Sequence, residues 1–182
     1  MTQRDPAVQA LIDKEACREL TALYARSLDR CDLELMKSVF HPDATFEHAD
    51  HYKGSAIGFA EMAVPLMQSI GPIQHSLCQH IVELDGDSAY GEAYGIAFQR
   101  VRAEDGSSID CFVGARVFDR YERRDGVWKI AARRTVVDWN LDVPTCETWG
   151  RGGLGEAHLS EEHRGTKDRT DPLYAWLQSG KR

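Results

Sequence analysis

The sequence lacks any long run of apolar residues and any cluster of basic ones. No stretch approaches the roughly 18 apolar residues of a membrane span, and residues 1–6 lack the apolar core of a secretory signal. The formal net charge is −7, with Lys and Arg scattered along the chain, so no basic stripe favours a phosphate backbone. These absences argue against a membrane or nucleic-acid partner and indicate a cytoplasmic protein.

Paired cysteines are also missing from the sequence. The five cysteines are odd in number, widely spaced and contain no Cys-x-x-Cys pair. This usage indicates reduced thiols in a reducing compartment. Because a free cysteine most often acts as a small buried hydrophobe, none is nominated as a nucleophile. The cysteines are Cys17, Cys31, Cys78, Cys111 and Cys146.

What the sequence does have is an ordinary globular composition over 182 residues, 42% hydrophobic and 28% charged. This length fits one domain with a sizeable core. We place that domain at residues 1–145 and a polar C-terminal tail at residues 146–182. The tail ends in the apolar residues Leu173, Tyr174, Trp176 and Leu177, so we expect it to pack on its own core or on a neighbouring subunit.

Three helices are expected in the first seventy residues. Apolar residues spaced by three or four predict a helix over residues 7–28. A short helix over residues 33–40 should end before Pro42, which with Asp43 opens a turn. A third pattern over residues 57–70 contains Pro65, which should kink or break the helix.

Three Asp-Gly pairs divide the next seventy residues. Asp-Gly between apolar runs is a strong hairpin signal, because glycine accepts a positive φ. A meander of four long strands follows, which must twist and curl, and the fold class is therefore α+β, with helices packed on a long curved sheet. The expected strands cover residues 73–84, 87–103, 109–123 and 127–141.

The second of these strands has one face of small residues. Alternation places Gly91, Ala93, Gly95 and Ala97 on one face and larger side chains on the other. The larger side chains are Tyr90, Tyr94, Ile96 and Phe98. The small face either packs closely against another element or leaves room for a ligand.

Several segments together resemble one family. The sequence is similar to the SnoaL-like branch of the nuclear-transport-factor-two-like, or cystatin-like, cone folds over most of residues 10–141. Its enzymes include hexachlorocyclohexane dehydrochlorinase, bile-acid dehydratase and scytalone dehydratase. The matching residues are Leu23, Tyr24 and Asp29, the Phe40–Phe46 segment, Tyr52–Gly54, His75, the Tyr121–Lys129 segment and Arg133.

The resemblance implies a cofactor-independent elimination in which a histidine paired with an aspartate removes a proton. His75 is then the candidate base, since imidazole titrates near neutral pH, and Asp29 orients it and stabilises the imidazolium. Arg133 meets the developing negative charge. Tyr24 holds a substrate oxygen or protonates the leaving group. Five residues on a helix rotate by roughly 140°, so we expect Tyr24 and Asp29 to flank the pocket mouth.

Strand alternation offers a different arginine. It groups Arg134, and not Arg133, with the apolar Trp128, Ile130 and Val136. Arg134 takes the role if that face lines the pocket. The other face, with Val137 and Trp139, could equally line it and would keep Arg133, and a bulge would also change the alternation. The family motif favours Arg133.

Each of these residues also has a structural interpretation. His75 fits a core histidine, Asp29 a solvated charge, and Tyr24 a packing residue of the apolar stripe. The cluster of Glu47, His48, Asp50 and His51 has metal-ligand residue types, but its spacing fits no usual zinc site. We therefore expect a polar hairpin tip at the open end of the cone, within reach of a substrate, with no metal and no cofactor.

The sequence thus predicts a lyase or isomerase acting on a small, fairly apolar cyclic substrate, assembled as a homodimer or homotrimer. Two alternatives stay open, because this fold also serves without catalysis. One is a small-ligand-binding protein. The other is a partner subunit like the β subunits of ring-hydroxylating dioxygenases.

Overall fold

The computed structural model describes residues 5–146 and 165–179. The first helix, α1 (Pro6–Asp29), begins one residue after the start of the first stretch. The Asp5 carboxylate accepts a hydrogen bond from the Ala7 N–H at 2.8 Å, which caps the helix. Pro6 occupies the first turn, where its missing N–H has no helical partner to lose. The helix matches its prediction to within one residue at each end.

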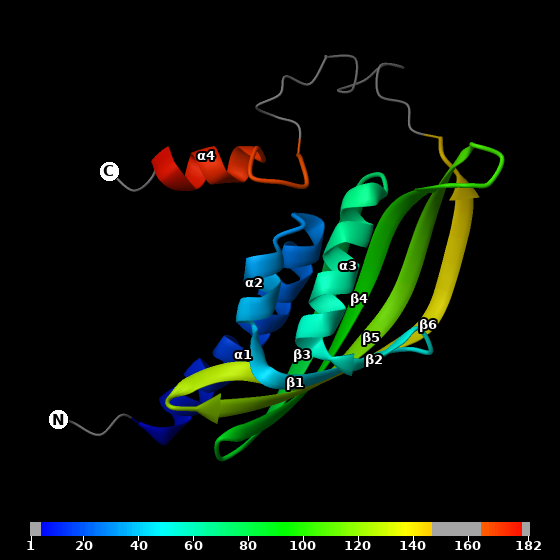
Figure 1. The fold of residues 1–182 in the computed structure, drawn as a ribbon. Coiled ribbons are helices and arrows are strands. Elements are labelled where there is room, and N and C mark those ends of the chain that lie inside the picture. The colour runs from blue at the N-terminus through cyan, green and yellow to red at the C-terminus, as the bar shows by residue number, and fades with distance from the viewer. Residues whose placement is uncertain (1–4, 147–164, 180–182) are drawn as a thin grey trace.

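Six strands form one curved sheet in the described part of the chain (Figure 1). The order is β2-β1-β6-β5-β4-β3, and all neighbours are antiparallel except β1 and β6, which are parallel. The four predicted meander strands are confirmed to within three residues at each end. The strands are β1 (Phe40–His48), β2 (Tyr52–Ser55), β3 (Ile73–Asp85), β4 (Ser88–Arg102), β5 (Ser108–Arg124) and β6 (Val127–Pro144).

The second helix, α2 (Leu33–Ser38), ends earlier than predicted. Phe40 instead begins β1, pairs with Ile130 and is 1% exposed. The predicted turn at Pro42 is also wrong, because Pro42 lies within β1 where the pairing with β6 is irregular. A residue without an N–H is tolerated at such an irregularity, so burial of Phe40 in the sheet outweighs the local proline signal.

The third helix, α3 (Ala56–Ser69), runs through Pro65 without the predicted break. The Ser55 hydroxyl accepts a hydrogen bond from the Gly58 N–H at 3.0 Å and caps the start of the helix. Pro65 is exposed, whereas the adjacent Val64 is buried in the core. Packing of the buried side of α3 therefore maintains the helix across the proline.

The predicted Asp-Gly turns connect the long strands. Gly86, Gly106 and Gly126 have φ of 61°, 83° and 80°, which glycine adopts without a Cβ clash. These turns fix the order of β3 to β6 from local sequence alone.

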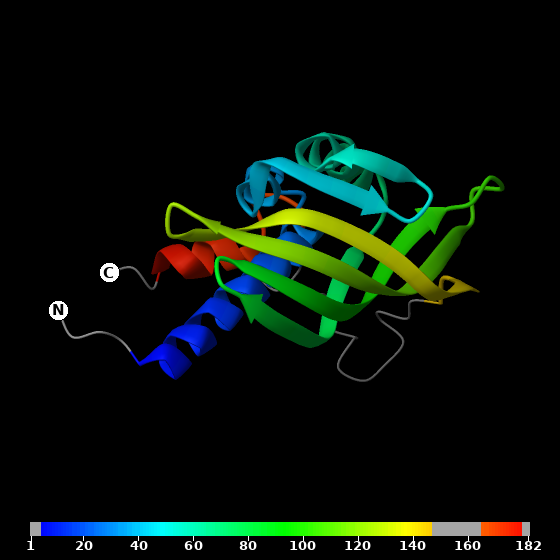
Figure 2. The same cartoon turned by 90° about the horizontal axis from the view of Figure 1, so that it is seen from below.

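The helices α1, α2 and α3 cover one face of the curled sheet (Figure 2). Aromatic rings form the core between them, and the rings of Phe46 and Phe59 stack with centroids 4.0 Å apart. The indole N–H of Trp128 donates to Asp13 of α1 at 2.9 Å, which ties that helix to β6. Each fully buried large side chain contributes roughly 1.5–3 kcal/mol to folding.

Residues 165–171 lie against the ends of α1 and α3 and lead into the last helix, α4 (Pro172–Ser179) (Figure 1). Most of the preceding part of the predicted tail, residues 147–164, lies outside the described residues. Leu173 and Tyr174 are half-buried, whereas Trp176 is 75% exposed. Among the described helices, none has the length and apolar character needed to cross a membrane.

Candidate active site

A cavity of about 350 Å³ lies between α1, α3 and the inner face of the sheet. The small residues Ala93, Gly95 and Ala97 of β4 line it, although Tyr94 and Ile96 also contribute to its wall. The small-residue face of the second long strand thus leaves room for a ligand. The volume falls within the range of small-molecule sites.

His75 and Asp29 meet at one side of this cavity. The Nδ1 atom of His75 lies 2.6 Å from Oδ1 of Asp29. The same carboxylate accepts the backbone N–H of His75 at 3.1 Å and 3.0 Å from its two oxygens. The carboxylate therefore holds both the ring and the strand that bears it. Because Nδ1 is engaged, Nε2 is the ring nitrogen that remains for a substrate.

The expectation that Tyr24 and Asp29 both flank the cavity mouth is wrong. Tyr24 is buried and lines the cavity, whereas Asp29 lies behind His75 and lines a hollow on the outer side of the pair. The five-residue separation turns the two side chains to different faces of α1. The face of α1 that carries Asp29 points toward the start of β3.

Arg133 is the arginine that reaches the cavity. Its side chain is fully buried and lines the cavity, whereas the Arg134 side chain is 62% exposed and pairs with Glu47. The prediction from strand alternation is wrong because β6 contains a bulge. Tyr121 pairs with Ile130, but Arg120 pairs with Ala132, which leaves Ala131 as the extra residue. The bulge shifts inward-facing positions from even to odd numbers.

A buried polar network holds the Arg133 guanidinium. Nε and Nη2 donate to the two oxygens of Asp119 at 2.7 Å and 2.6 Å, and Nη2 also donates to Thr21 at 3.2 Å. The Tyr121 hydroxyl donates to Asp119 at 2.8 Å, and its oxygen lies 3.3 Å from Nε2 of His80. These hydrogen bonds offset part of the cost of keeping the ion pair away from water.

One nitrogen of this guanidinium is left over. Nη1 of Arg133 is buried and has no hydrogen-bond partner in the described part of the chain. A buried unsatisfied donor costs about 1–3 kcal/mol. The guanidinium also lies over the Tyr24 ring, 4.0 Å from its centroid, which fixes its plane.

Burial raises the pKa of the Tyr24 phenol to about 12, with Asp119 adding to the shift and Arg133 opposing it. The phenol is therefore protonated at neutral pH and available as a hydrogen-bond donor.

Sequence reasoning missed Asp119, and it named His48 only as part of a polar hairpin tip within reach of a substrate. Asp119 is a charged residue on the inward face of β5 directly opposite Arg133, so an acid within an alternating apolar strand was its signal. His48 shares a strand face with Phe46, stacks on Phe59 at 5.5 Å and lines the cavity. Burial lowers the pKa of His48, which favours the neutral imidazole.

The polar residues of the β1–β2 hairpin lie on two sides of the sheet. His48 and His51 line the cavity, whereas Glu47 pairs with Lys53 at 3.3 Å on the other side. Among the described residues, no group of three His, Cys, Asp or Glu side chains is arranged to hold a metal ion.

A curled mixed sheet, helices on one face and a cavity between them define an α+β cone of the cystatin-like, nuclear-transport-factor-two-like kind. The sequence profile of the SnoaL-like domain family matches residues 9–134. The chain therefore belongs to the SnoaL-like family. Comparison with curated protein sequences gave no match.

Solved structures share this fold at low identity. A hexachlorocyclohexane dehydrochlorinase, LinA type 2, superposes with a TM-score of 0.67 and 20% identity over 78% of this chain and 96% of the other. A putative scytalone dehydratase from Novosphingobium aromaticivorans gives 0.66 and 16% over 77% and 93%. A protein of unknown function from Mycobacterium tuberculosis, solved as a single-residue variant, gives 0.59 and 24% over 74% and 76%.

Proposed function

We propose that this chain is a cofactor-independent lyase or isomerase acting on a small, fairly apolar cyclic substrate. The observation that carries the proposal is the 2.6 Å contact between His75 and Asp29 beside a cavity lined mostly by apolar residues. An imidazole oriented by a carboxylate suits proton abstraction from carbon. The dehydrochlorinase and the putative dehydratase that share the fold are consistent with such chemistry.

In the proposed reaction, His75 carries the proton that leaves the substrate carbon. His75 Nε2 takes a proton from a substrate carbon, and Asp29 stabilises the resulting imidazolium. In an elimination, the electrons of the broken C–H bond form a C=C bond, and the leaving group departs with the electrons of its own bond. In an isomerisation, the imidazolium returns its proton to a different carbon.

The opposite wall of the cavity would receive the negative charge that develops on a substrate oxygen. Nη1 of Arg133 and the Tyr24 phenol are the donors proposed for it. A well-placed donor in a dry site contributes roughly 3 kcal/mol to the transition state. Because Asp119 neutralises Arg133, the site favours a neutral oxygen, such as a ketone, over a carboxylate.

Substitution of His75 tests the proposal. We expect His75→Gln to lower kcat by about 10²–10⁴-fold on any substrate found among cyclic β-hydroxy ketones and halogenated cyclohexanes. His41→Gln is the matched control, since His41 contacts the Glu122 carbonyl at 2.9 Å outside the cavity. Full turnover in a folded His75→Gln variant would sink the mechanism.

Two other outcomes identify the alternatives. Tight binding of cyclic ligands by the wild-type chain without turnover would indicate a small-ligand-binding protein. Co-purification with a larger iron-containing chain would indicate a dioxygenase partner subunit.

We also propose a homo-oligomer, a dimer or trimer, in the cytoplasm. Large apolar side chains of the outer sheet face are well exposed, with Tyr90 at 53% and Phe118 at 37%, which favours association. The five cysteines are unpaired, as expected in a reducing compartment. A monomer at micromolar concentration by light scattering would contradict the assembly.

A further inference from the structure

A short segment near the C-terminus, residues 165–171, contacts the ends of two helices, and we call it the clasp. The ammonium group of its Lys167 donates to three carbonyl oxygens, those of Met67 at 2.6 Å, Ile70 at 2.6 Å and Gly71 at 3.0 Å. These carbonyls lie at the C-terminal end of α3, where helical partners run out and a cation is favoured. Lys167 therefore fastens the clasp to the junction of α3 and β3.

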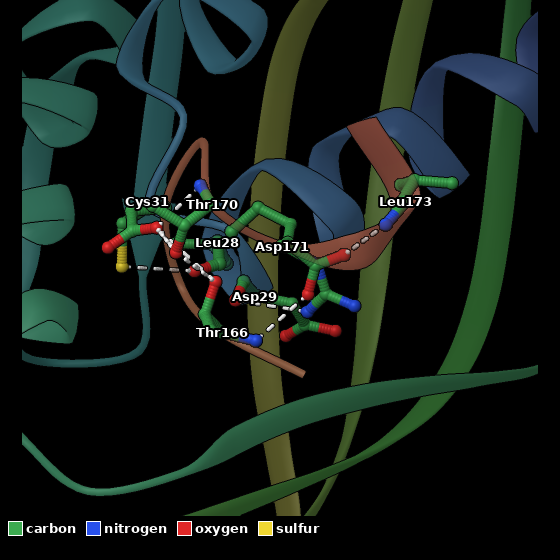
Figure 3. A network of polar contacts seen from close by, with 9 residues as sticks. Leu28, Asp29, Cys31, Thr166, Thr170, Asp171 and Leu173 are labelled. Atoms are coloured by element: carbon green, nitrogen blue, oxygen red, sulfur yellow. Dashed lines mark hydrogen bonds and ion pairs between the residues drawn. The ribbon is translucent and has the colours of Figure 1, made fainter. Parts of the chain in front are cut away.

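The other end of the clasp is fastened to α1. Asp171 is 4% exposed, and its Oδ2 lies 3.3 Å from Nε of Arg30, the residue after Asp29. Its carboxylate also accepts the backbone N–H groups of Thr166 at 2.9 Å and Leu173 at 3.1 Å. Figure 3 shows this network against the C-terminal end of α1. Asp171 thus stabilises the turn of the clasp and its contact with α1 together.

The two fastening points lie next to the two members of the Asp29–His75 pair. Arg30 directly follows Asp29, and Gly71 precedes His75 by four residues. Asp29 and His75 also line the hollow on the outer side of the pair, to which Leu173 contributes. Separation of the end of α1 from the start of β3 would lengthen the 2.6 Å contact between the pair, and the clasp contacts both sides of that joint.

We propose that Lys167 and Asp171 are positioning residues that hold His75 and Asp29 at hydrogen-bond distance. The inference rests on the proposed function for its catalytic meaning, but the geometry it concerns exists without substrate. Displacing a catalytic group by about 1 Å can cost roughly 100-fold in rate. Neither residue lines the cavity, so each acts through the pair and not on the substrate.

Proton NMR of the unliganded protein tests this inference. A short imidazole N–H to carboxylate bond gives a far-downfield proton signal, which ¹⁵N-histidine labelling detects and which the His75→Gln variant assigns by its loss. We expect Lys167→Met to abolish or broaden this signal while circular dichroism stays native. Lys53→Met is the matched control, because the Lys53 side chain is 81% exposed and ion-paired on the other side of the sheet, and it should keep the signal.

Asp171→Asn is the second variant, which keeps the shape of the side chain and removes the charge that faces Arg30. Asp171→Asn should weaken the same signal. Lys167→Arg should keep part of the signal that Lys167→Met loses, because a guanidinium also donates to carbonyls. An unchanged signal in folded Lys167→Met and Asp171→Asn would overturn the proposal. Unfolding of both would also overturn it, since the clasp would then support the whole fold and not the pair.

The outcome is separate from that of the proposed function. A downfield signal lost in Lys167→Met supports the clasp even where no substrate is turned over. Conversely, loss of turnover in His75→Gln together with an unchanged signal in the clasp variants supports the elimination and removes the positioning role.

Discussion

Two aspartates of this protein hold a basic side chain beside the same cavity, and they do so in different surroundings. The Asp119 and Arg133 side chains are 1% and 0% exposed and belong to a network with Thr21 and Tyr121. The Asp29 and His75 side chains are 14% and 27% exposed. The first pair is fixed and its charges cannot be released to water, whereas the second keeps a ring nitrogen for exchange with a ligand.

In the proposed function, this difference separates binding from reaction. A buried ion pair is costly to break and therefore serves as a fixed donor, with Nη1 of Arg133 as its free position in the described part of the chain. The imidazole of His75 is 27% exposed and lines the cavity, so a ligand can reach it without reorganising the core. In the proposed function, the two pairs thus supply a fixed donor and a proton acceptor to one cavity.

The largest expected effect is the loss of stability when the buried Asp119–Arg133 pair is broken. Asp119→Asn leaves the Arg133 charge without its counter-charge and should lower the free energy of unfolding by about 3–5 kcal/mol. The matched change Asp29→Asn should cost only about 1 kcal/mol, because the amide oxygen still accepts the His75 backbone N–H. Urea denaturation measures both, and equal losses would contradict the distinction between the pairs.

The second effect is on rate and concerns the exposed pair. Asp29→Asn removes the charge that stabilises the imidazolium, so kcat should fall by roughly 100-fold with a smaller change in KM. Steady-state kinetics on an identified substrate measures this split. A rise in KM with unchanged kcat would instead assign Asp29 to substrate binding.

The third effect is on the pH dependence of stability and involves His80, which contacts the buried network. Burial lowers the pKa of His80, so the unfolded chain takes up a proton near pH 6.5 while the folded chain resists it. This contribution is complete above pH 6.5 and declines as the pH falls below it, by at most about 1.4 kcal/mol per pH unit. Denaturation between about pH 7 and 5 measures the slope.

His80→Gln sharpens that measurement. The variant lacks the titrating ring, so its stability should decline less steeply with acid than that of the wild type. An unchanged slope would show that His80 does not distinguish the folded from the unfolded state.

The smallest expected effect concerns Tyr24, which lies over Arg133 in the cavity. Tyr24→Phe keeps the ring and removes one donor, so the catalytic efficiency should fall about fivefold to tenfold, the equivalent of about 1 kcal/mol. Because the phenol pKa is raised to about 12, the pH–rate profile between about pH 6 and 9 should keep its shape. A lost basic limb in this range would assign Tyr24 a titrating role.

Local sequence determined the meander and its order. The Asp-Gly pairs specify turns through glycine's access to positive φ, and strand alternation specifies the small face of β4 that lines the cavity. Proline signals were less reliable: the turn at Pro42 is absent and α3 is not broken at Pro65, because burial of Phe40 and of the inner side of α3 outweighs a local proline preference.

For the site, the sequence by itself determined the candidates but not their arrangement. His75, Asp29, Tyr24 and Arg133 were predicted from residue types and a family resemblance, while Asp119 was missed. Only the tertiary structure decided that Arg133, and not Arg134, faces the cavity, because one extra residue in β6, Ala131, reverses the alternation of the residues that follow it as far as Val137. Only long-range packing of α1 against β3 decided the distance between Asp29 and His75, since contacts across 46 residues are not encoded in local periodicity.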